Sequence, residues 1–255
     1  MKHKILHIAI VTALILLFSS HFSNAAIRTA TVSGNWSSTA TWGGASVPTS
    51  ADDVRINGNI TVTVDIANAQ CASLTYLYSN NRTTMVTISG TNSLVIGGLL
   101  SMPYPNLGAT STLNVNAGTV TAGALTMGAT FSGRDNVINI STGTLTVLGE
   151  IKTGTTGCQF TFSGAGTFNM ERSLNGSPTL TTVIGSSVNY TGSNSQTIYA
   201  TTYNGNLGIS GTGTKVMDAT TTVNGTLYLT NGVLVNNSFL TMANESTISR
   251  SAGML

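Results

Sequence analysis

The sequence predicts an all-β protein whose strands form a parallel, right-handed β-helix, or β-solenoid, with irregular rungs of 19–28 residues. Apolar and polar residues alternate strictly in segments such as Asn59–Ile66, which is the period-two pattern of a half-buried strand. Several of these segments resemble one another at similar separations along the chain. Glycine-containing turns end many of them, and glycine allows backbone angles at sharp corners that other residues avoid.

The repeat is clearest in the middle of the chain. Leu113–Thr121 matches Ile138–Thr146 position by position, 25 residues later, and Phe160–Phe168 follows after 22 more with one inserted residue. Three later segments continue the pattern: Val188–Gly192, Leu207–Gly211 and Leu227–Gly232. Self-similarity at a period of about 20–30 residues indicates stacked units that bury their apolar faces against their neighbours.

Stacking of these units makes a specific prediction about the core. Val115, Ile140 and Phe162 should lie above one another, on strands that are parallel neighbours in sequence order. The alternative fold is a series of β-sandwich repeats, since short strands at a spacing of about 8–12 residues are also typical of antiparallel sandwiches.

Residues 1–25 have the three parts of a secretory signal peptide. A basic start is followed by the apolar run Ile8–Phe18 and by small residues up to Ala25, after which we expect cleavage. The run has 11 residues, whereas a membrane-spanning helix needs about 20. We therefore expect a secreted or outer-surface protein that begins at Ala26, with no membrane insertion of the mature chain.

Removal of this segment leaves a neutral chain. All three histidines lie within residues 1–25, and eight Lys/Arg side chains remain against eight Asp/Glu. Charged residues make up only 7% of the sequence, compared with about 25% in typical domains. A chain without a basic cluster lacks the electrostatic footprint of nucleic-acid binding and the polybasic stretch that holds a protein to anionic membranes.

Residues 26–70 differ in composition from the rest, and we interpret them as an N-terminal cap or first rungs. The order Gly34–Gly44, Val47-Pro48-Thr49 and Asp52–Ile56, followed by the strand at Asn59–Asp65, resembles the opening of the eight-glycine domain, an extracellular β-rich module. The resemblance covers about 40 residues. It implies an extracellular location and contact with matrix or polysaccharide, but it brings no set of binding residues with it.

Residues 71–255 are predicted to be β-solenoid repeats. The segments Gly211–Lys215 and Thr220–Leu227 look like the β-strand repeats of large secreted proteins of the type IX (Por) export route, as does the whole chain. Proteins of that type usually end in a sorting domain. This sequence stops inside what looks like another repeat, so we expect a chain truncated at its C-terminus.

Two residue pairs are candidates for a special role. Trp36 and Trp42 could form an aromatic platform for a sugar ring, but burial as a plug at the end of the solenoid is the favoured interpretation. Cys71 and Cys158 could form a disulfide in an oxidising compartment. Two small thiols packed as apolar groups in the core are an equally good interpretation.

The sequence points to no catalytic site, metal site or cofactor. The predicted mature chain has no histidine for a catalytic triad or a histidine-based metal site. Asp52 and Asp53 are adjacent, so on a strand they point to opposite faces, and backbone capping after Pro48 is the better interpretation. Four other acidic residues are scattered singly along the chain: Asp218, and three that lie close to a basic residue in the sequence, Asp135 near Arg134, Glu150 near Lys152 and Glu171 near Arg172.

We therefore expect a non-catalytic structural or adhesin-like surface protein whose partners are extracellular polysaccharides or other surface proteins. The alternative is a carbohydrate-binding or polysaccharide-degrading β-helix module, which a groove with clustered carboxylates or an exposed tryptophan would favour. An ice-binding solenoid is a third hypothesis, suggested by Thr61-Val62-Thr63 and Thr220-Thr221-Thr222. Irregular rung lengths argue against the flat threonine ladder that ice binding needs.

Overall fold

The structure is a computed structural model that describes residues 25–77, 83–105, 107–129 and 133–252. The predicted signal peptide lies outside the described residues, apart from Ala25. Within the described ranges, the chain forms 27 β-strands and one short 3-10 helix, η1 (Thr39–Trp42). No described helix is both long and apolar enough to cross a membrane.

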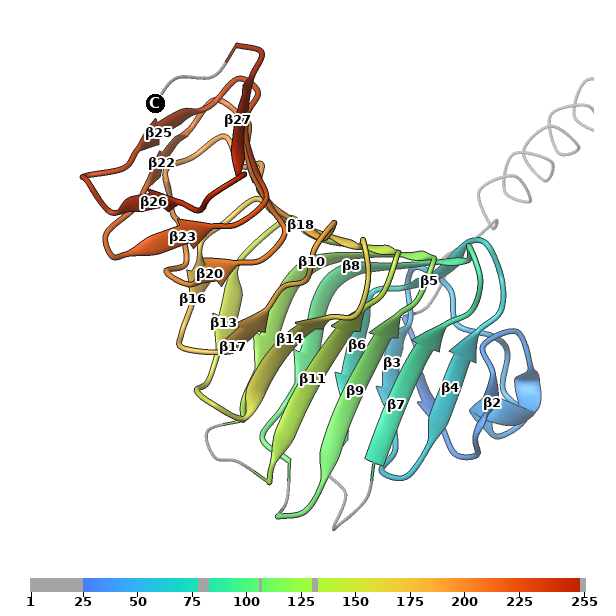
Figure 1. The fold of residues 1–255 in the computed structure, drawn as a ribbon. Coiled ribbons are helices and arrows are strands. Elements are labelled where there is room, and N and C mark those ends of the chain that lie inside the picture. The colour runs from blue at the N-terminus through green and yellow to red at the C-terminus, as the bar shows by residue number, and fades with distance from the viewer. Residues whose placement is uncertain (1–24, 78–82, 106, 130–132, 253–255) are drawn as a thin grey trace, which may run out of the picture.

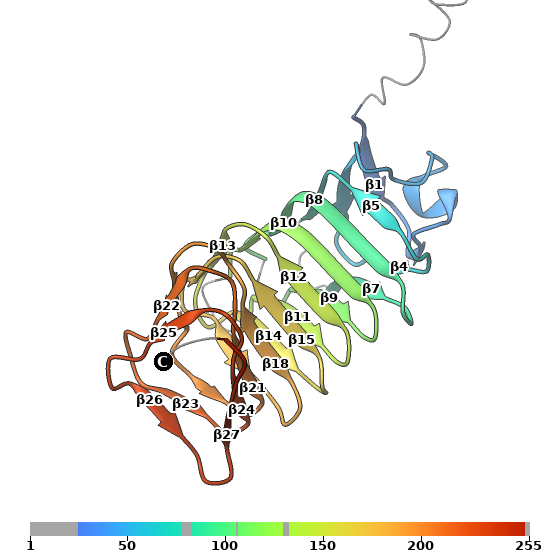
Figure 2. The same ribbon diagram turned by 90° about the horizontal axis from the view of Figure 1, so that it is seen from above.

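The strands stack in parallel into a β-solenoid of about nine turns (Figures 1 and 2). Each turn has three faces, and parallel pairing joins most strands of a face to the equivalent strands of the next turn. Face 1 contains β5 (Ala69–Cys71), the first part of β8 (Ser93–Met102) and of β10 (Thr119–Met127), β12 (Thr144–Val147), β15 (Thr167–Met170), β18 (Ser187–Tyr190), β21 (Asn206–Ile209), β24 (Thr226–Leu229) and β27 (Thr247–Arg250). The long strands β8 and β10 each serve two faces.

Face 2 contains β1 (Ile27–Ala30), β3 (Asp53–Ile56), β6 (Ser73–Tyr76), the second part of β8 and of β10, β13 (Ile151–Thr153), β16 (Leu174–Asn175), β19 (Gln196–Thr197), β22 (Thr214–Val216) and β25 (Val233–Val235). Face 3 contains β2 (Gly34–Asn35), β4 (Thr61–Val64), β7 (Thr83–Ile88), β9 (Thr110–Val115), β11 (Asp135–Ile140), β14 (Cys158–Phe162), β17 (Thr179–Thr181), β20 (Thr202–Tyr203), β23 (Thr221–Val223) and β26 (Leu240–Met242).

The predicted parallel solenoid is confirmed by the strand register. On face 3, Ile140 of β11 pairs with Val115 of β9 on one side and with Phe162 of β14 on the other. All three side chains are buried in one core. Paired residues lie from 19 positions apart, between β18 and β21, to 28 apart, between β2 and β4, which matches the predicted rung lengths.

One part of the predicted alignment is wrong. The continued repeat predicts that Val188–Gly192 and the two segments after it follow Leu113–Val115, Ile138–Ile140 and Phe160–Phe162 on the same face, which is face 3. In the structure β18, β21 and β24 belong to face 1, where Val188 pairs with Phe168 of β15. The motif of two apolar residues around a polar one, followed by a glycine turn, occurs on more than one face, so the motif alone cannot distinguish the faces.

Close stacking of the turns explains the glycines at some corners. A Cβ atom added to Gly118 would lie 2.2 Å from the carbonyl oxygen of Asn92, and one added to Gly143 would lie 2.3 Å from that of Gly118. Both contacts are far shorter than a side chain permits. The corner between faces 3 and 1 therefore needs glycine at these turns.

The C-terminal turns lean away from the rest of the solenoid (Figure 1). Face 1 runs without a break through β15, β18 and β21, but the sheet pairing on face 3 ends at β17 and starts again at β20. Side chains bridge the gaps: Thr182 Oγ1 accepts a hydrogen bond from Asn204 N at 2.7 Å, and Ser173 Oγ accepts one from Thr197 N at 2.9 Å. The bend therefore lies where two of the three faces lose their backbone ladder.

Candidate functional site

The outer surface of face 1 carries two rows of uncharged polar side chains. Alternation along each strand points every second residue outward, and the parallel register stacks equivalent residues. The first row is Ser93, Thr119, Thr144, Thr167, Ser187, Asn206, Thr226 and Thr247. The second row includes Thr121, Thr146, Asn169, Asn189, Gly208, Tyr228 and Ser249.

Hydrogen bonds between rungs hold these side chains in place. Asn189 Nδ2 donates to Asn169 Oδ1 at 2.8 Å, and Asn169 Nδ2 donates to Thr146 Oγ1 at 3.2 Å. Asn206 Nδ2 similarly donates to Ser187 Oγ at 3.3 Å. The rows are therefore ordered arrays of amides and hydroxyls that present both donors and acceptors to solvent.

The second row contains a hollow at Gly208. The glycine sits between Asn189 and Tyr228, and a Cβ atom added to it would lie 2.1 Å from Asn189 Oδ1. Tyr228 is 43% exposed beside this gap. The hollow, which we name the face 1 hollow, has a volume of about 390 Å³ and is lined by Ser187, Asn189, Thr191, Gly208, Ile209, Ser210, Tyr228 and Thr230.

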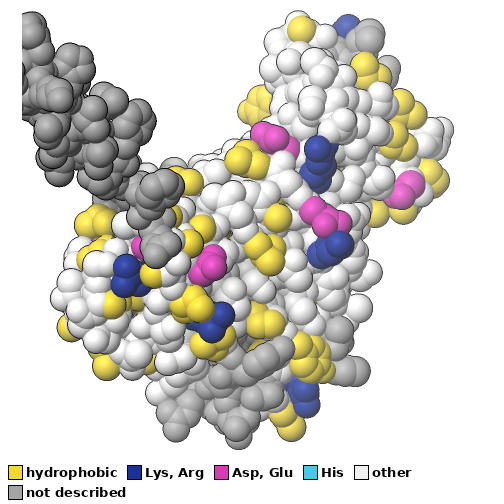
Figure 3. Space-filling view, turned by 180° about the vertical axis from the view of Figure 1, so that it is seen from behind, with side chains coloured by type: hydrophobic (Ala, Val, Ile, Leu, Met, Phe, Trp, Pro, Cys, Tyr) yellow, Lys and Arg dark blue, Asp and Glu magenta, His cyan; other side chains and the backbone are white. Residues whose placement is uncertain are grey.

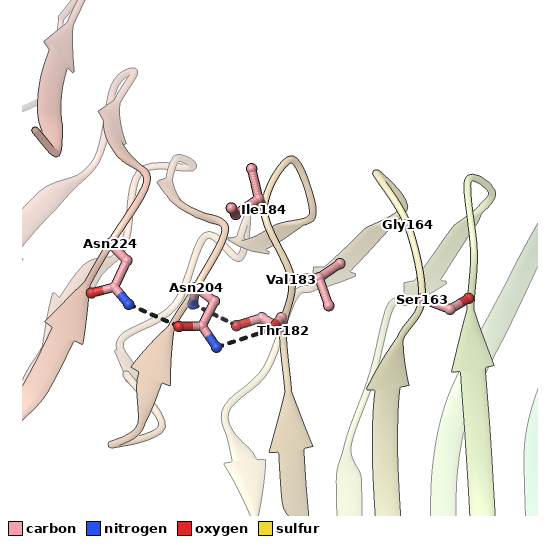
Figure 4. A pocket seen from close by; sticks show the side chains of 7 residues that line it. All are labelled: Ser163, Gly164, Thr182, Val183, Ile184, Asn204 and Asn224. Atoms are coloured by element: carbon pink, nitrogen blue, oxygen red, sulfur yellow. Dashed lines mark hydrogen bonds between the residues drawn. The ribbon is translucent and has the colours of Figure 1, made fainter.

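A larger hollow lies at the bend, on the corner that leads from face 3 to face 1 (Figure 4). This bend groove has a volume of about 680 Å³ and is lined by Ser163, Gly164, Thr182, Val183, Ile184, Asn204 and Asn224. In Figure 4 a chain of hydrogen bonds crosses it, from Asn224 Nδ2 to Asn204 Oδ1 at 2.8 Å and from Asn204 Nδ2 to the carbonyl oxygen of Thr182 at 3.1 Å. Ile184 is 91% exposed.

Neither hollow contains an ionisable side chain other than the phenol of Tyr228. Their linings combine amides, hydroxyls and exposed apolar surface. Such a lining can exchange hydrogen bonds with the hydroxyls of a sugar and pack against its C–H faces, because aromatic and aliphatic surfaces contribute contact area while amides fix orientation. It contains no carboxyl, imidazole or amino group to serve as a general acid or base.

The charged side chains lie outside the linings of the face 1 hollow and the bend groove. Three of those singled out from the sequence come together around face 2: Lys152 Nζ lies 3.0 Å from Glu150 Oε2, and Glu150 and Arg172 line a hollow of about 310 Å³ with Ser173, Asn175 and Ser195. Both members of the ion pair are exposed, and such pairs contribute little to stability. Figure 3 shows charged atoms in small, separate groups on the side seen from behind.

No group of three or more His, Cys, Asp or Glu side chains within the described ranges is placed to hold a metal ion. Glu150 is the only carboxylate in the lining of the hollow of about 310 Å³ beside it, which we name the face 2 hollow. Glycosidases act with two carboxyl groups that flank the bond to be cleaved. The face 2 hollow does not supply that pair.

The tryptophan pair is buried and not available to a ligand. Trp36 and Trp42 pack edge to face with ring centroids 5.1 Å apart, and Trp42 Nε1 donates to the carbonyl oxygen of Trp36 at 2.8 Å. The proposed sugar platform does not fit this burial. The pair instead fills the N-terminal end of the core at η1, as the interpretation favoured from the sequence predicts.

The two adjacent aspartates have separate roles. Asp52 is buried and caps the preceding turn, since its Oδ2 accepts hydrogen bonds from Thr49 N and Thr49 Oγ1, both at 2.8 Å. Asp53 points outward from β3, where Oδ1 accepts a hydrogen bond from Ser73 Oγ at 2.5 Å. The capping interpretation of Asp52 is confirmed, and the two carboxylates do not converge on one site.

The cysteines are not paired. Cys71 lies on β5 of face 1 and Cys158 on β14 of face 3, and both are free and buried. Cys158 Sγ donates to the carbonyl oxygens of Met127 and Ala129. Burial raises the pKa of both thiols, that of Cys71 to about 12. The disulfide considered from the sequence is absent, and both residues are unreactive core thiols.

The threonine runs do not form rows of threonine alone. Thr63 stacks on Thr87 and then on Asn114 along face 3. In the second run Thr221 is buried and only its neighbours face outward. Asparagine therefore interrupts the ladder that an ice-binding surface requires.

Sequence reasoning did not identify the residues of either hollow as a site. Tyr228 carried a signal, because it is an aromatic residue at the outward position of Leu227-Tyr228-Leu229. The bend groove has no local signal, since Val183, Asn204 and Asn224 come from successive rungs. No protein-family model, no curated protein and no solved structure matches the chain.

Proposed function

We propose that this chain is a secreted or cell-surface structural protein, adhesin-like and non-catalytic, that contacts neutral extracellular glycans through the face 1 hollow and the bend groove. The proposal rests on one observation: the rows of ordered amides and hydroxyls and the two uncharged hollows lie together on the C-terminal rungs. The rigid stack of turns then serves as the rod that presents them.

Neutral glycans suit this surface better than charged ones. Amides and hydroxyls both donate and accept hydrogen bonds, as sugar hydroxyls do. The exposed Tyr228 ring offers a face on which a pyranose can stack. A uronic acid or a sulfated sugar would lose hydration at its anionic group without gaining a cationic partner in either hollow.

The test is binding of residues 26–255 to a panel of neutral and acidic polysaccharides, measured by affinity electrophoresis or calorimetry. We expect retention by neutral polymers that is insensitive to salt, because no ion pair contributes. Tyr228→Ala should weaken the binding about tenfold, which is the loss of roughly 1.4 kcal/mol of stacking. Tyr228→Phe keeps the ring and should bind as the parent does.

Two more variants separate the hollows from the rest of the surface. Asn204→Ala removes the central amide of the bend groove and should weaken binding several-fold, as for the loss of one or two hydrogen bonds. Thr121→Ala changes an outward residue of face 1 that lies several turns before the two hollows, so it should leave glycan binding unchanged. Binding confined to acidic polymers, or equal losses in all three alanine variants, would contradict the proposal.

A further inference from the structure

Ala26 is fixed through both of its backbone polar groups. Its carbonyl oxygen accepts a hydrogen bond from Asp53 N at 2.8 Å, which starts the pairing of β1 with β3. Its nitrogen donates to Asp52 Oδ1 at 3.0 Å. The preceding residue, Ala25, is exposed and belongs to no strand. The ordered ladder of face 2 therefore begins at the residue where the mature chain is predicted to begin.

The carboxylate that faces Ala26 N is unusual in its burial. The Asp52 residue is only 2% exposed, and its second oxygen is already occupied by the two hydrogen bonds from Thr49. The nearest cation, Arg28, has Nε 3.6 Å from Asp52 Oδ1 and makes no hydrogen bond through that atom. Burial alone would raise the pKa of Asp52, but the hydrogen bonds from Thr49 and Ala26 and the charge of Arg28 lower it, so the group is a carboxylate.

We propose that Asp52 is a binding site for the α-ammonium group that is created when the bond between Ala25 and Ala26 is hydrolysed. A peptidase adds water across this bond: the hydroxyl goes to the carbonyl carbon of Ala25, and a proton goes to the nitrogen of Ala26. The new amine takes up a second proton at neutral pH. Cleavage thus replaces a neutral amide donor at 3.0 Å from Asp52 Oδ1 with a cation at the same place.

The consequence is that correct processing stabilises the first turn of the solenoid. The acceptor of this hydrogen bond is ionised in both forms, and cleavage adds the attraction between the new positive charge and the buried carboxylate. The pairing is also specific for the cleavage position, because consecutive Cα atoms are about 3.8 Å apart and a chain one residue longer would carry its charge away from the buried carboxylate. The inference rests on the proposed export of the protein, but not on any glycan binding.

The other charged groups near this point are the same before and after cleavage. Arg28 approaches the same carboxylate oxygen from β1, and Asp53 faces outward with Ser73 as its partner. A comparison between two forms that differ only at the nitrogen of Ala26 therefore isolates the new ion pair.

The experiment compares residues 26–255 with a free α-amine against the same chain acetylated at Ala26, by thermal unfolding at several pH values. At pH 6 the free form should have a Tm higher by roughly 2–4 °C, as for about 1 kcal/mol in a chain of this length. Pairing raises the pKa of the α-amine above its ordinary value of about 8. The advantage is therefore fully present below that value and lost as the pH rises through the raised pKa, so the two forms should melt together near pH 11.

Asp52→Asn keeps the shape of the side chain and removes its charge, so the difference between the free and acetylated forms should disappear in that background. If the variant does not fold, the α-amine of the parent chain is titrated by NMR, where a pKa raised above its ordinary value supports the pairing. Equal melting of the free and acetylated parent forms, an unshifted α-amine pKa, or a difference that persists in Asp52→Asn would overturn the proposal. So would an exported protein whose first residue is not Ala26.

Discussion

The stacked core predicts a large penalty for shortening Ile140. This side chain is fully buried on face 3, between Val115 and Phe162 of the neighbouring turns. Its Cγ2 also lies against Gly166, where an added Cβ atom would come within 2.5 Å of it. Ile140→Ala removes three carbon atoms, worth about 2.4 kcal/mol of transfer free energy, and leaves a cavity that neighbours on two turns cannot easily fill. We expect a total loss of about 3 kcal/mol.

Equilibrium unfolding in guanidinium chloride, followed by circular dichroism, measures this loss, and thermal unfolding should show a Tm lowered by roughly 6–12 °C. Val137→Ala is the matched control, because Val137 lies on the same strand but points outward and is only half-buried. It should cost about 0.5–1 kcal/mol. An Ile140→Ala variant no less stable than Val137→Ala would refute the inward stacking of face 3.

Three further predictions concern other parts of the chain. The buried Nζ of Lys215 donates a hydrogen bond at 2.8 Å to each of the carbonyl oxygens of Gly192 and Gly213. Lys215→Met leaves both oxygens without this donor, so denaturant titrations should show a loss of about 1–3 kcal/mol in the free energy of unfolding. Acid should destabilise the parent more than Asp52→Asn: the pKa of Asp52 is lowered in the fold, so its contribution is present above about pH 4 and is lost as the pH falls through the lowered pKa. Reducing-end assays on neutral and acidic polysaccharides should detect no turnover, and activity that disappears in Glu150→Ala would show that the face 2 hollow is catalytic.

Alternation predicted the strands, and the repeated segments predicted the solenoid and the register of its middle rungs. Val115, Ile140 and Phe162 stack as predicted because the inserted residue in the third segment falls in the turn, where it does not shift the strand. Val188 was assigned to the wrong face, since every face buries alternate residues and uses glycine at corners. Assignment to a face needs the count of strands per turn, which the sequence pattern does not contain.

The candidate site was harder to predict than the fold. Capping by Asp52 follows from its position after Pro48, but its contact with Ala26, 26 residues earlier, depends on how the first turn closes. The bend lies where the side chains of Ser173 and Thr182 take the place of backbone ladder bonds. Hydroxyl residues are so common in this chain that these two are not distinguished by type, and the groove beside them could not be expected.

The central claim is that neutral glycans bind on the C-terminal rungs, and hydrogen–deuterium exchange with a bound neutral oligosaccharide tests it most directly. Ligand contact should slow exchange in the segments that line the two hollows, at residues 182–192, 204–211 and 224–230, while the N-terminal turns exchange as in the free protein. At the same oligosaccharide concentration, Tyr228→Ala should reduce the protection around β18, β21 and β24. Protection centred instead on Glu150 and Arg172, or binding without protection at either hollow, would contradict the account.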